Sequence, residues 1–229
     1  MEHASEIRGV RIRGTERHTQ GPPSPQRTLI PGRPDSPLAT EGIPEGGHQI
    51  STFIDLNEFG KLFQTFQHSA WRLETRRGYA SDREDATYRE FVETGTVAWD
   101  LDDDWCRNMC AQTADGKRVG RVRIIDDPPT TGQLYLLDNA KRNSATGEDM
   151  RNLWRADAER LQLPAEDFWI FDSRVIALLH FDEADTLLHV ELLTEPAEVV
   201  RYAQVRDAAI HHSSSFEHFT ELVAARRHE

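Results

Sequence analysis

Residues 71–76, with the sequence WRLETR, place a charged side chain at every second position. Successive side chains of a β-strand point to opposite faces, so this period predicts an extended segment with Arg72, Glu74 and Arg76 on one face. If an upstream helix continued through this stretch, Arg72 and Glu74 would instead point about 200° apart. The alternation therefore predicts a strand with one charged and one apolar face.

A second strand with the same pattern is predicted in "KRVGRVRIIDD". Val122 and Ile124 fall on one face, and Arg121 and Arg123 fall on the other. The "DPP" that follows ends the strand, because proline lacks the backbone donor that a strand needs. Two such strands side by side would form a local basic groove.

The surrounding segments predict the fold class. An apolar stripe at three- and four-residue spacing precedes the first strand and predicts a helix; its members are Phe59, Leu62, Phe63, Phe66 and Ala70. Between residues 164 and 193, two apolar runs flank "DEAD", which predicts a β-hairpin. Pro196 suits the first turn of a later helix. This order predicts an α+β domain over residues 51–229, with a mostly antiparallel sheet and flanking helices.

Residues 1–50 differ in composition from the rest of the chain. "GPPSPQRTLIPGRPDSPLATEGIPEGG" is rich in proline, glycine and serine and has no apolar periodicity. Such a stretch cannot bury enough apolar surface to offset the entropy lost on ordering. We expect a disordered tail, or alternatively a translation start nearer residue 50.

Charge and hydropathy limit the classes of function. The formal net charge is -12, which disfavours direct, charge-driven binding to nucleic acid. No apolar run approaches the roughly 18 residues of a membrane span. The N-terminus has no apolar signal-peptide region, and the chain has 2 cysteines, so we expect a cytoplasmic protein that does not cross a membrane.

The charged face of the first strand is the leading candidate site. In one interpretation Arg72 and Arg76 hold an anionic group, while Glu74 orients them or acts as a base. In the other, the row is a solvated face whose charges neutralise one another. A further candidate is "EDFWIFDS", where Asp167 and Asp172 flank Trp169: a carboxylate there is either partly desolvated, paired with an arginine, or part of a turn.

No motif identifies a metal or a cofactor. "WDLDDDW" (residues 99–105) lacks the spacing of a calcium loop, and Cys106 and Cys110 lack a second ligand pair for zinc. The predicted hairpin places His180 opposite His189 with Glu191 nearby, which is compatible with a metal but is also an ordinary cross-strand arrangement. No phosphate loop, dinucleotide fingerprint or nucleophile elbow is present. The cofactor is therefore unknown, and the sequence does not decide whether the protein is an enzyme.

The order of "FGKLFQTFQHSAWRLETRRGY", "GKRVGRVRIIDDPP", "NSATGEDMR", "LPAEDFWIFDS" and "HFD" resembles a family of actinobacterial proteins of unknown function, over about residues 55–216. Its members are often encoded beside helix-turn-helix regulators. The resemblance implies an accessory regulatory role, with such a regulator as a protein partner. The motif positions that it marks are Arg72, Glu74, Tyr79, Arg121, Arg123, Glu148, Asp167, Trp169 and Asp172.

Three functions therefore compete, and the acidic net charge disfavours the third, direct binding to nucleic acid. The first is a regulatory or interaction protein that binds a protein partner or a small anionic ligand in an arginine-lined groove. The second is an enzyme of unrecognised type that acts on a phosphate-bearing or nucleotide substrate through arginine clamps and a carboxylate.

Overall fold

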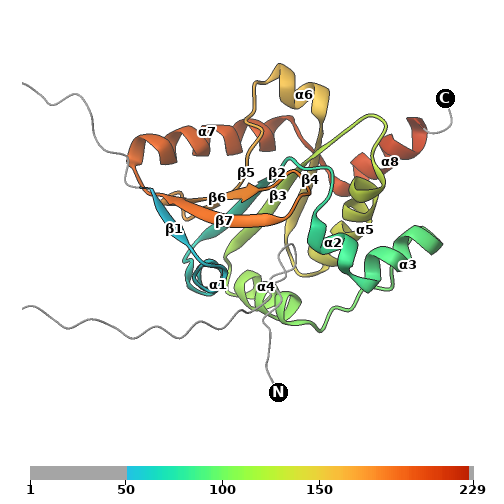
Figure 1. Ribbon diagram of the computed structural model, residues 1–229, viewed down its shortest axis with the longest axis horizontal. Helices are drawn as coiled ribbons and strands as arrows, with labels where there is room; N and C mark the ends of the chain where they lie inside the picture. The colour runs from blue at the N-terminus through green and yellow to red at the C-terminus, as the bar shows by residue number, and fades with distance from the viewer. Residues whose placement is uncertain (1–50, 227–229) are drawn as a thin grey trace, which may run out of the picture. The chain divides into compact units, whose positions relative to one another are not determined.

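The computed structural model describes residues 51–226 (Figure 1). The predicted disordered tail, residues 1–50, lies outside the described residues. Within residues 51–226, no helix has the length and apolar character needed to cross a membrane.

One eight-stranded sheet forms the centre of the described part, in the order β1-β7-β6-β5-β2-β3-β4-β8. The strands are β1 (Thr52–Ile54), β2 (Ser69–Glu74), β3 (Arg118–Ile125), β4 (Asp149–Trp154), β5 (Asp167–Phe171), β6 (Val175–Phe181), β7 (Leu187–Leu193) and β8 (Ser214–Ser215). The β2–β3 and β3–β4 pairs are parallel, and every other neighbouring pair is antiparallel. The predicted α+β fold with a mostly antiparallel sheet is confirmed.

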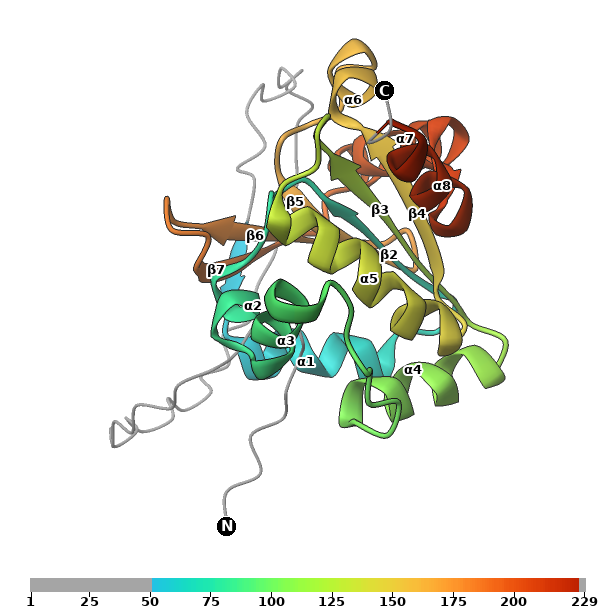
Figure 2. The same cartoon turned by 90° about the vertical axis from the view of Figure 1, so that its right-hand side faces the viewer.

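Helices cover both faces of this sheet (Figure 2). They are α1 (Leu56–Thr65), α2 (Ala80–Glu84), α3 (Ala86–Thr94), α4 (Asp104–Ala114), α5 (Thr131–Ala145), α6 (Arg155–Arg160), α7 (Pro196–His212) and α8 (Phe216–Arg226). Helix α7 packs on one face, against a core that includes Leu73 and Val122. Helices α1 and α4 pack on the other face, where Phe63 and Met109 meet Trp169.

The predicted alternation is confirmed for residues 71–74 and explains how charge enters the interior, but β2 ends at Glu74 and does not include Arg76. Trp71 and Leu73 join the apolar core beneath α7. Arg72 and Glu74 point to the opposite face, and both are buried as well. Strand β3 runs beside β2 in parallel, with Arg121 opposite Arg72. The two charged rows therefore share one face of the sheet.

The first helix is shorter than its apolar stripe predicts. Helix α1 ends at Thr65, and Ala70 belongs to β2 instead. The Asp172 carboxylate accepts hydrogen bonds from the backbone N–H groups of Gln67, His68 and Ser69, at 2.7–2.9 Å. These bonds hold the chain in the turn between α1 and β2, so a long-range contact overrides the local helical period.

Candidate functional site

A cluster of charged side chains lies on the inner face of β2 and β3, and we call it the charged cluster. Its members are Arg72, Glu74, Arg121, Arg123, Glu148 and Asp167. Glu74 is at its centre: Arg72 Nη1 and Arg121 Nη1 each lie 3.0 Å from Glu74 Oε1, and Arg123 Nε contacts Oε2. Adjacent parallel strands in register bring three guanidinium groups to one carboxylate.

Asp167, on β5, completes one end of the charged cluster. Arg72 Nη2 lies 3.2 Å from Asp167 Oδ2, and the Tyr79 hydroxyl donates to the same oxygen at 2.5 Å. The backbone N–H and the hydroxyl of Thr75 both donate to Oδ1 at 2.7 Å. Each oxygen of this buried carboxylate is therefore satisfied, as buried charges require.

Glu148 completes the other end. Arg121 Nε lies 2.9 Å from Glu148 Oε2, while Trp105 Nε1 and Asn143 Nδ2 donate to Oε1 at 3.0 and 2.8 Å. The Arg121 guanidinium also lies over the Trp105 and Trp169 rings, at 5.2 and 5.1 Å from the ring centres. Such cation–π contacts favour the charged form of a buried arginine.

Burial and charge balance determine whether the charged cluster is open to a ligand in this structure. The side chains of Arg72 and Arg121 are 5% exposed, and those of Arg123 and Glu74 are 3% exposed. Burial on its own would raise the pKa of Glu74, but Arg123, Arg72 and Arg121 outweigh it and hold that pKa well below its usual range. Three arginines face three carboxylates, so the charged cluster is neutral and closed. The prediction that these arginines bind a ligand stays a prediction.

Of the expected site residues that are not members of the charged cluster, Tyr79 and Trp169 contact it, whereas Arg76 and Asp172 lie away from it. Arg76 lies beyond the end of β2, where its Nε donates to Asp185 Oδ1 at 2.7 Å. Asp172 lies in the β5–β6 turn, where it holds the start of β2. Burial works against ionisation of Asp172, but its three backbone N–H bonds lower the pKa of this carboxyl.

Asp82 is a candidate residue that sequence reasoning missed. It lies on α2, the short helix that follows Tyr79. Burial raises the pKa of the Asp82 carboxyl to about 7, with a further rise from the charge of Glu74 and an opposing effect from Arg123 and Arg72. In the sequence Asp82 belongs to the polar run "SDRED", where nothing distinguishes it from the exposed Glu84. A carboxyl group that titrates near neutral pH beside arginines is typical of functional sites.

The β6–β7 loop holds the segment that carries Asp82. Asp185 accepts from Arg76 Nε at 2.7 Å and from Arg83 Nη1 at 3.2 Å, and its backbone carbonyl accepts from Ala80 N at 3.1 Å. Arg83 Nη2 also donates to the carbonyl of Ala184 at 2.5 Å. We call these contacts the Asp185 latch. They fasten α2 to a loop about one hundred residues further along the chain.

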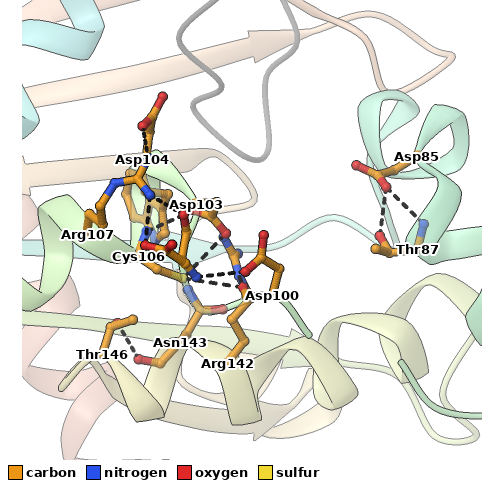
Figure 3. Close-up of polar contacts among 12 residues, drawn as sticks. Asp85, Thr87, Asp100, Asp103, Asp104, Cys106, Arg107, Arg142, Asn143 and Thr146 are labelled. Carbon is orange, nitrogen blue, oxygen red and sulfur yellow. Dashed lines mark hydrogen bonds and ion pairs between the residues drawn. The ribbon is translucent and has the colours of Figure 1, made fainter. Parts of the chain in front are cut away.

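The acidic stretch 99–105 has a structural role at the start of α4 (Figure 3). Asp103 is the N-cap of α4 and pairs with the buried Arg142 of α5. Burial raises the pKa of the neighbouring Cys106 thiol to about 11. At neutral pH this thiol stays protonated, which makes it a poor nucleophile.

The histidines of the hairpin lie opposite each other, as the sequence predicts. The His180 and His189 rings stack with their centres 4.6 Å apart, and His180 Nε2 is 2.8 Å from Glu191 Oε2. Within residues 51–226, no three or more histidine, cysteine, aspartate or glutamate side chains are arranged so that they could hold a metal ion.

The chain belongs to the family described as "Domain of unknown function (DUF6879)", whose model matches residues 57–221. No curated protein sequence matches it. Solved structures that it resembles include Nuc, a phospholipase D family member from Salmonella typhimurium, at 10% identity and a TM-score of 0.43, covering 68% of this chain and 86% of that one. NucT from Helicobacter pylori is 8% identical, with a TM-score of 0.42, covering 72% and 98%. The archaeal chromatin protein TrmBL2 is 10% identical, with a TM-score of 0.41, covering 73% and 54%. At such low TM-scores these likenesses say nothing about what the chain binds.

Proposed function

We propose that the protein is an accessory binding protein that holds a small anionic ligand at the charged cluster, beneath α2. The observation that carries this proposal is a set of buried polar atoms that lack hydrogen-bond partners within residues 51–226. There are five such side-chain atoms in this range: Arg72 Nε on β2 and Ser81 Oγ and Asp82 Oδ2 on α2 carry the proposal, and Asn143 Oδ1 and Asn152 Oδ1 are the other two. Buried polar groups are nearly always satisfied, so unpaired ones indicate a place for a bound molecule. Arg72 Nε would donate to the anion.

Charge balance predicts how the anion binds. The charged cluster and Asp82 together are neutral when Asp82 is protonated, and they carry one negative charge when Asp82 is ionised. An incoming anion therefore favours the protonated form of Asp82. Because the pKa of Asp82 is about 7, ligand affinity should fall as the pH rises above 7, by up to about tenfold for each pH unit.

Access to the site requires α2 to move. Tyr79, at the start of α2, is 2% exposed, and its ring centre lies 5.2 Å from Arg72 Cζ. The Asp185 latch holds the same segment. Release of this latch would uncover Arg72 without changing the sheet.

The test is a thermal-shift screen of the full chain with inorganic sulfate, 3′,5′-cyclic AMP and glucose 6-sulfate at pH 6 and pH 8, because the charge of these anions is the same at both pH values. A ligand at 100 times its Kd stabilises a protein by about 2.7 kcal/mol, which corresponds to roughly 5–10 °C for a domain of this size. We expect a larger shift at pH 6 than at pH 8. In Asp82→Asn, which cannot ionise, the shift should be equal at the two pH values.

Glu84→Gln is the matched control, because Glu84 lies on the same helix and is exposed. It should keep the pH dependence of the wild type. The proposal fails if no probe raises the midpoint at either pH, or if Asp82→Asn retains the pH dependence.

The protein partner in this proposal is a helix-turn-helix regulator, and the complex would form in the cytoplasm. The test is co-elution of the full chain with a regulator encoded beside it, in size-exclusion chromatography. Elution of the two proteins as separate peaks at micromolar concentration would contradict this part of the proposal.

A second candidate function is enzymatic, and Asp82 is the observation that favours it. A carboxyl with a pKa near 7 suits a general acid or base at neutral pH, and Arg72 and Arg123 would stabilise a phosphate-bearing substrate. The test is hydrolysis of p-nitrophenyl phosphate and of nucleotides by wild type and Asp82→Asn. The enzymatic function is supported if turnover is lost in the variant, and it is contradicted if the wild type shows none.

A further inference from the structure

A cavity of about 960 Å³ opens where β2 and β3 begin, at the opposite end of these strands from Glu74. Its wall comes from the first residues of both strands, the end of α4, the turn between α5 and β4, and one face of α7. We call it the strand-start cleft. Its volume lies in the range of small-molecule sites. It shares no lining residue with the charged cluster.

The strand-start cleft holds positive charge that no carboxylate neutralises. Within the described part of the chain, Lys117 and Arg118 form no ion pair: Lys117 Nζ donates to the Phe66 carbonyl at 2.8 Å and to the Gln112 amide oxygen at 2.6 Å. The carboxylates in the wall have other cations beside them. Arg206 Nε lies 2.8 Å from Asp207 Oδ1.

The second wall carboxylate is also next to an arginine. Asp149 Oδ1 lies 3.8 Å from Arg151 Nη1. In a protein with a net charge of -12, a cleft with two uncompensated cations is a local exception. An exposed arginine fork without a partner suits a carboxylate or a phosphate, which it can bind through two parallel hydrogen bonds.

Two helix ends reduce this positive potential. Helices α4 and α5 end at Ala114 and Ala145, both in the wall. Each helix C-terminus is equivalent to about half a negative charge. The two together offset about one of the two cations, so the strand-start cleft remains positive.

The rest of the wall is part apolar and part polar, with hydroxyl groups from Ser69, Thr113, Thr146 and Ser173. Its apolar side chains are those of Ala70, Trp71, Ala114, Val119, Ala145 and Ile210. An inorganic anion would leave this surface without a partner. A ligand with an apolar body would bury it and gain about 25 cal/mol for each Å² removed from water.

We propose that the strand-start cleft binds a small organic anion with an apolar body, of about the size of a mononucleotide, whose anionic group pairs with Arg118. This site is separate from the one proposed beneath α2. The chain also carries a reporter for it, because Cys110 lies in the wall and is exposed, whereas Cys106 is buried.

The experiment measures the rate at which iodoacetamide alkylates Cys110 in the full chain. The probes are AMP and 4-hydroxybenzoate, with adenosine as the uncharged analogue and inorganic phosphate as the anion without an apolar body. We expect at least one of the two organic anions to slow alkylation at least fivefold at millimolar concentration. Adenosine and phosphate should have little effect.

Arg118→Ala should remove the protection, and because this side chain is exposed the variant should keep the fold. Arg160→Ala is the matched control, since Arg160 is exposed on α6 and outside the strand-start cleft. Asp82→Asn should keep the protection, which separates this result from the site beneath α2. The proposal is overturned if neither organic anion protects Cys110, if phosphate protects it equally well, or if Arg118→Ala remains protected.

Discussion

Glu74 is the residue on which the buried arginines depend. One carboxylate contacts Arg72, Arg121 and Arg123, and all four side chains are at most 5% exposed. Removing one partner from a buried ion pair leaves uncompensated charge, which typically costs about 3–5 kcal/mol.

We therefore expect Glu74→Gln to lower the free energy of unfolding at pH 7 by roughly 3–5 kcal/mol, measured by urea denaturation. The folded-state pKa of Glu74 lies below its ordinary value of 4.5. Its contribution is therefore fully present above about pH 4.5 and is lost as the pH falls towards the folded-state value. The gap between variant and wild type should shrink in acid. If the free energy of unfolding falls by less than about 1 kcal/mol at pH 7, the buried arginines do not depend on Glu74.

Asp82 has the opposite linkage. Its pKa rises from 3.8 to about 7 on folding, so the folded protein binds the proton more tightly than the unfolded chain. Ionised Asp82 therefore costs stability, and the cost grows as the pH rises from about 4 to 7 and is constant above that. A rise of this size corresponds to at most about 4 kcal/mol.

Asp82→Asn should accordingly be more stable than the wild type at pH 8, by about 1–4 kcal/mol, with a smaller gain at pH 5. Thermal and urea unfolding at both pH values measure this. An equal effect at pH 5 and pH 8 would mean that Asp82 does not titrate with a raised pKa.

At the scale of single residues, the sequence predicted the charged rows but not Asp82. The alternation around Arg72 and Arg121 is a local pattern, and strand geometry turns it directly into a shared face. The burial of Asp82, and its closeness to Glu74 and Arg123, come from the way α2 packs in the folded chain. Burial of this kind has no sequence signature.

At the scale of elements, Gly132 controls how α5 meets the chain after β2. A Cβ atom on this residue would lie 2.4 Å from the Arg77 carbonyl oxygen and 3.2 Å from Gly78 Cα. Both atoms belong to backbone, so the clash cannot be relieved by rotating a side chain.

Gly132→Ala should therefore push the start of α5 away from residues 77–78 and lower the free energy of unfolding by more than about 2 kcal/mol. Gly95→Ala is a poor control because Gly95 has a φ of +79°. Ala145→Gly, at an exposed position of α5, serves as the comparison for helix propensity. Native-state hydrogen exchange at residues 77–84 should quicken only in Gly132→Ala. Unchanged stability and exchange would contradict the close contact.

Strand order was harder to predict than the strands themselves. The hairpin of β6 and β7 follows from two apolar runs around a short loop, and the register of His180 with His189 follows from it. The parallel pairing of β2 with β3 does not follow from a local pattern, because about forty residues separate the two strands. Which strands lie next to each other is decided by how α4 and α5 pack.

At the scale of the whole molecule, the net charge of -12 sets the behaviour towards nucleic acid. The arginines that could contact phosphates are mostly paired with carboxylates, as in the charged cluster. We expect the full chain to pass through a double-stranded DNA column at 50 mM salt without retention, since binding to DNA requires release of counterions by unpaired cations. Retention that weakens steadily with added salt would contradict this.

The Asp185 latch has a practical consequence for work with this protein. A short hairpin loop is an obvious place for an epitope tag, a fluorophore or an inserted domain. Here the loop also fastens α2, so an insertion at residues 182–186 would alter the covering of the arginines while leaving the sheet intact. A label placed there would report on the position of α2 over the arginines. The labelled protein should therefore not stand in for the native protein in binding experiments.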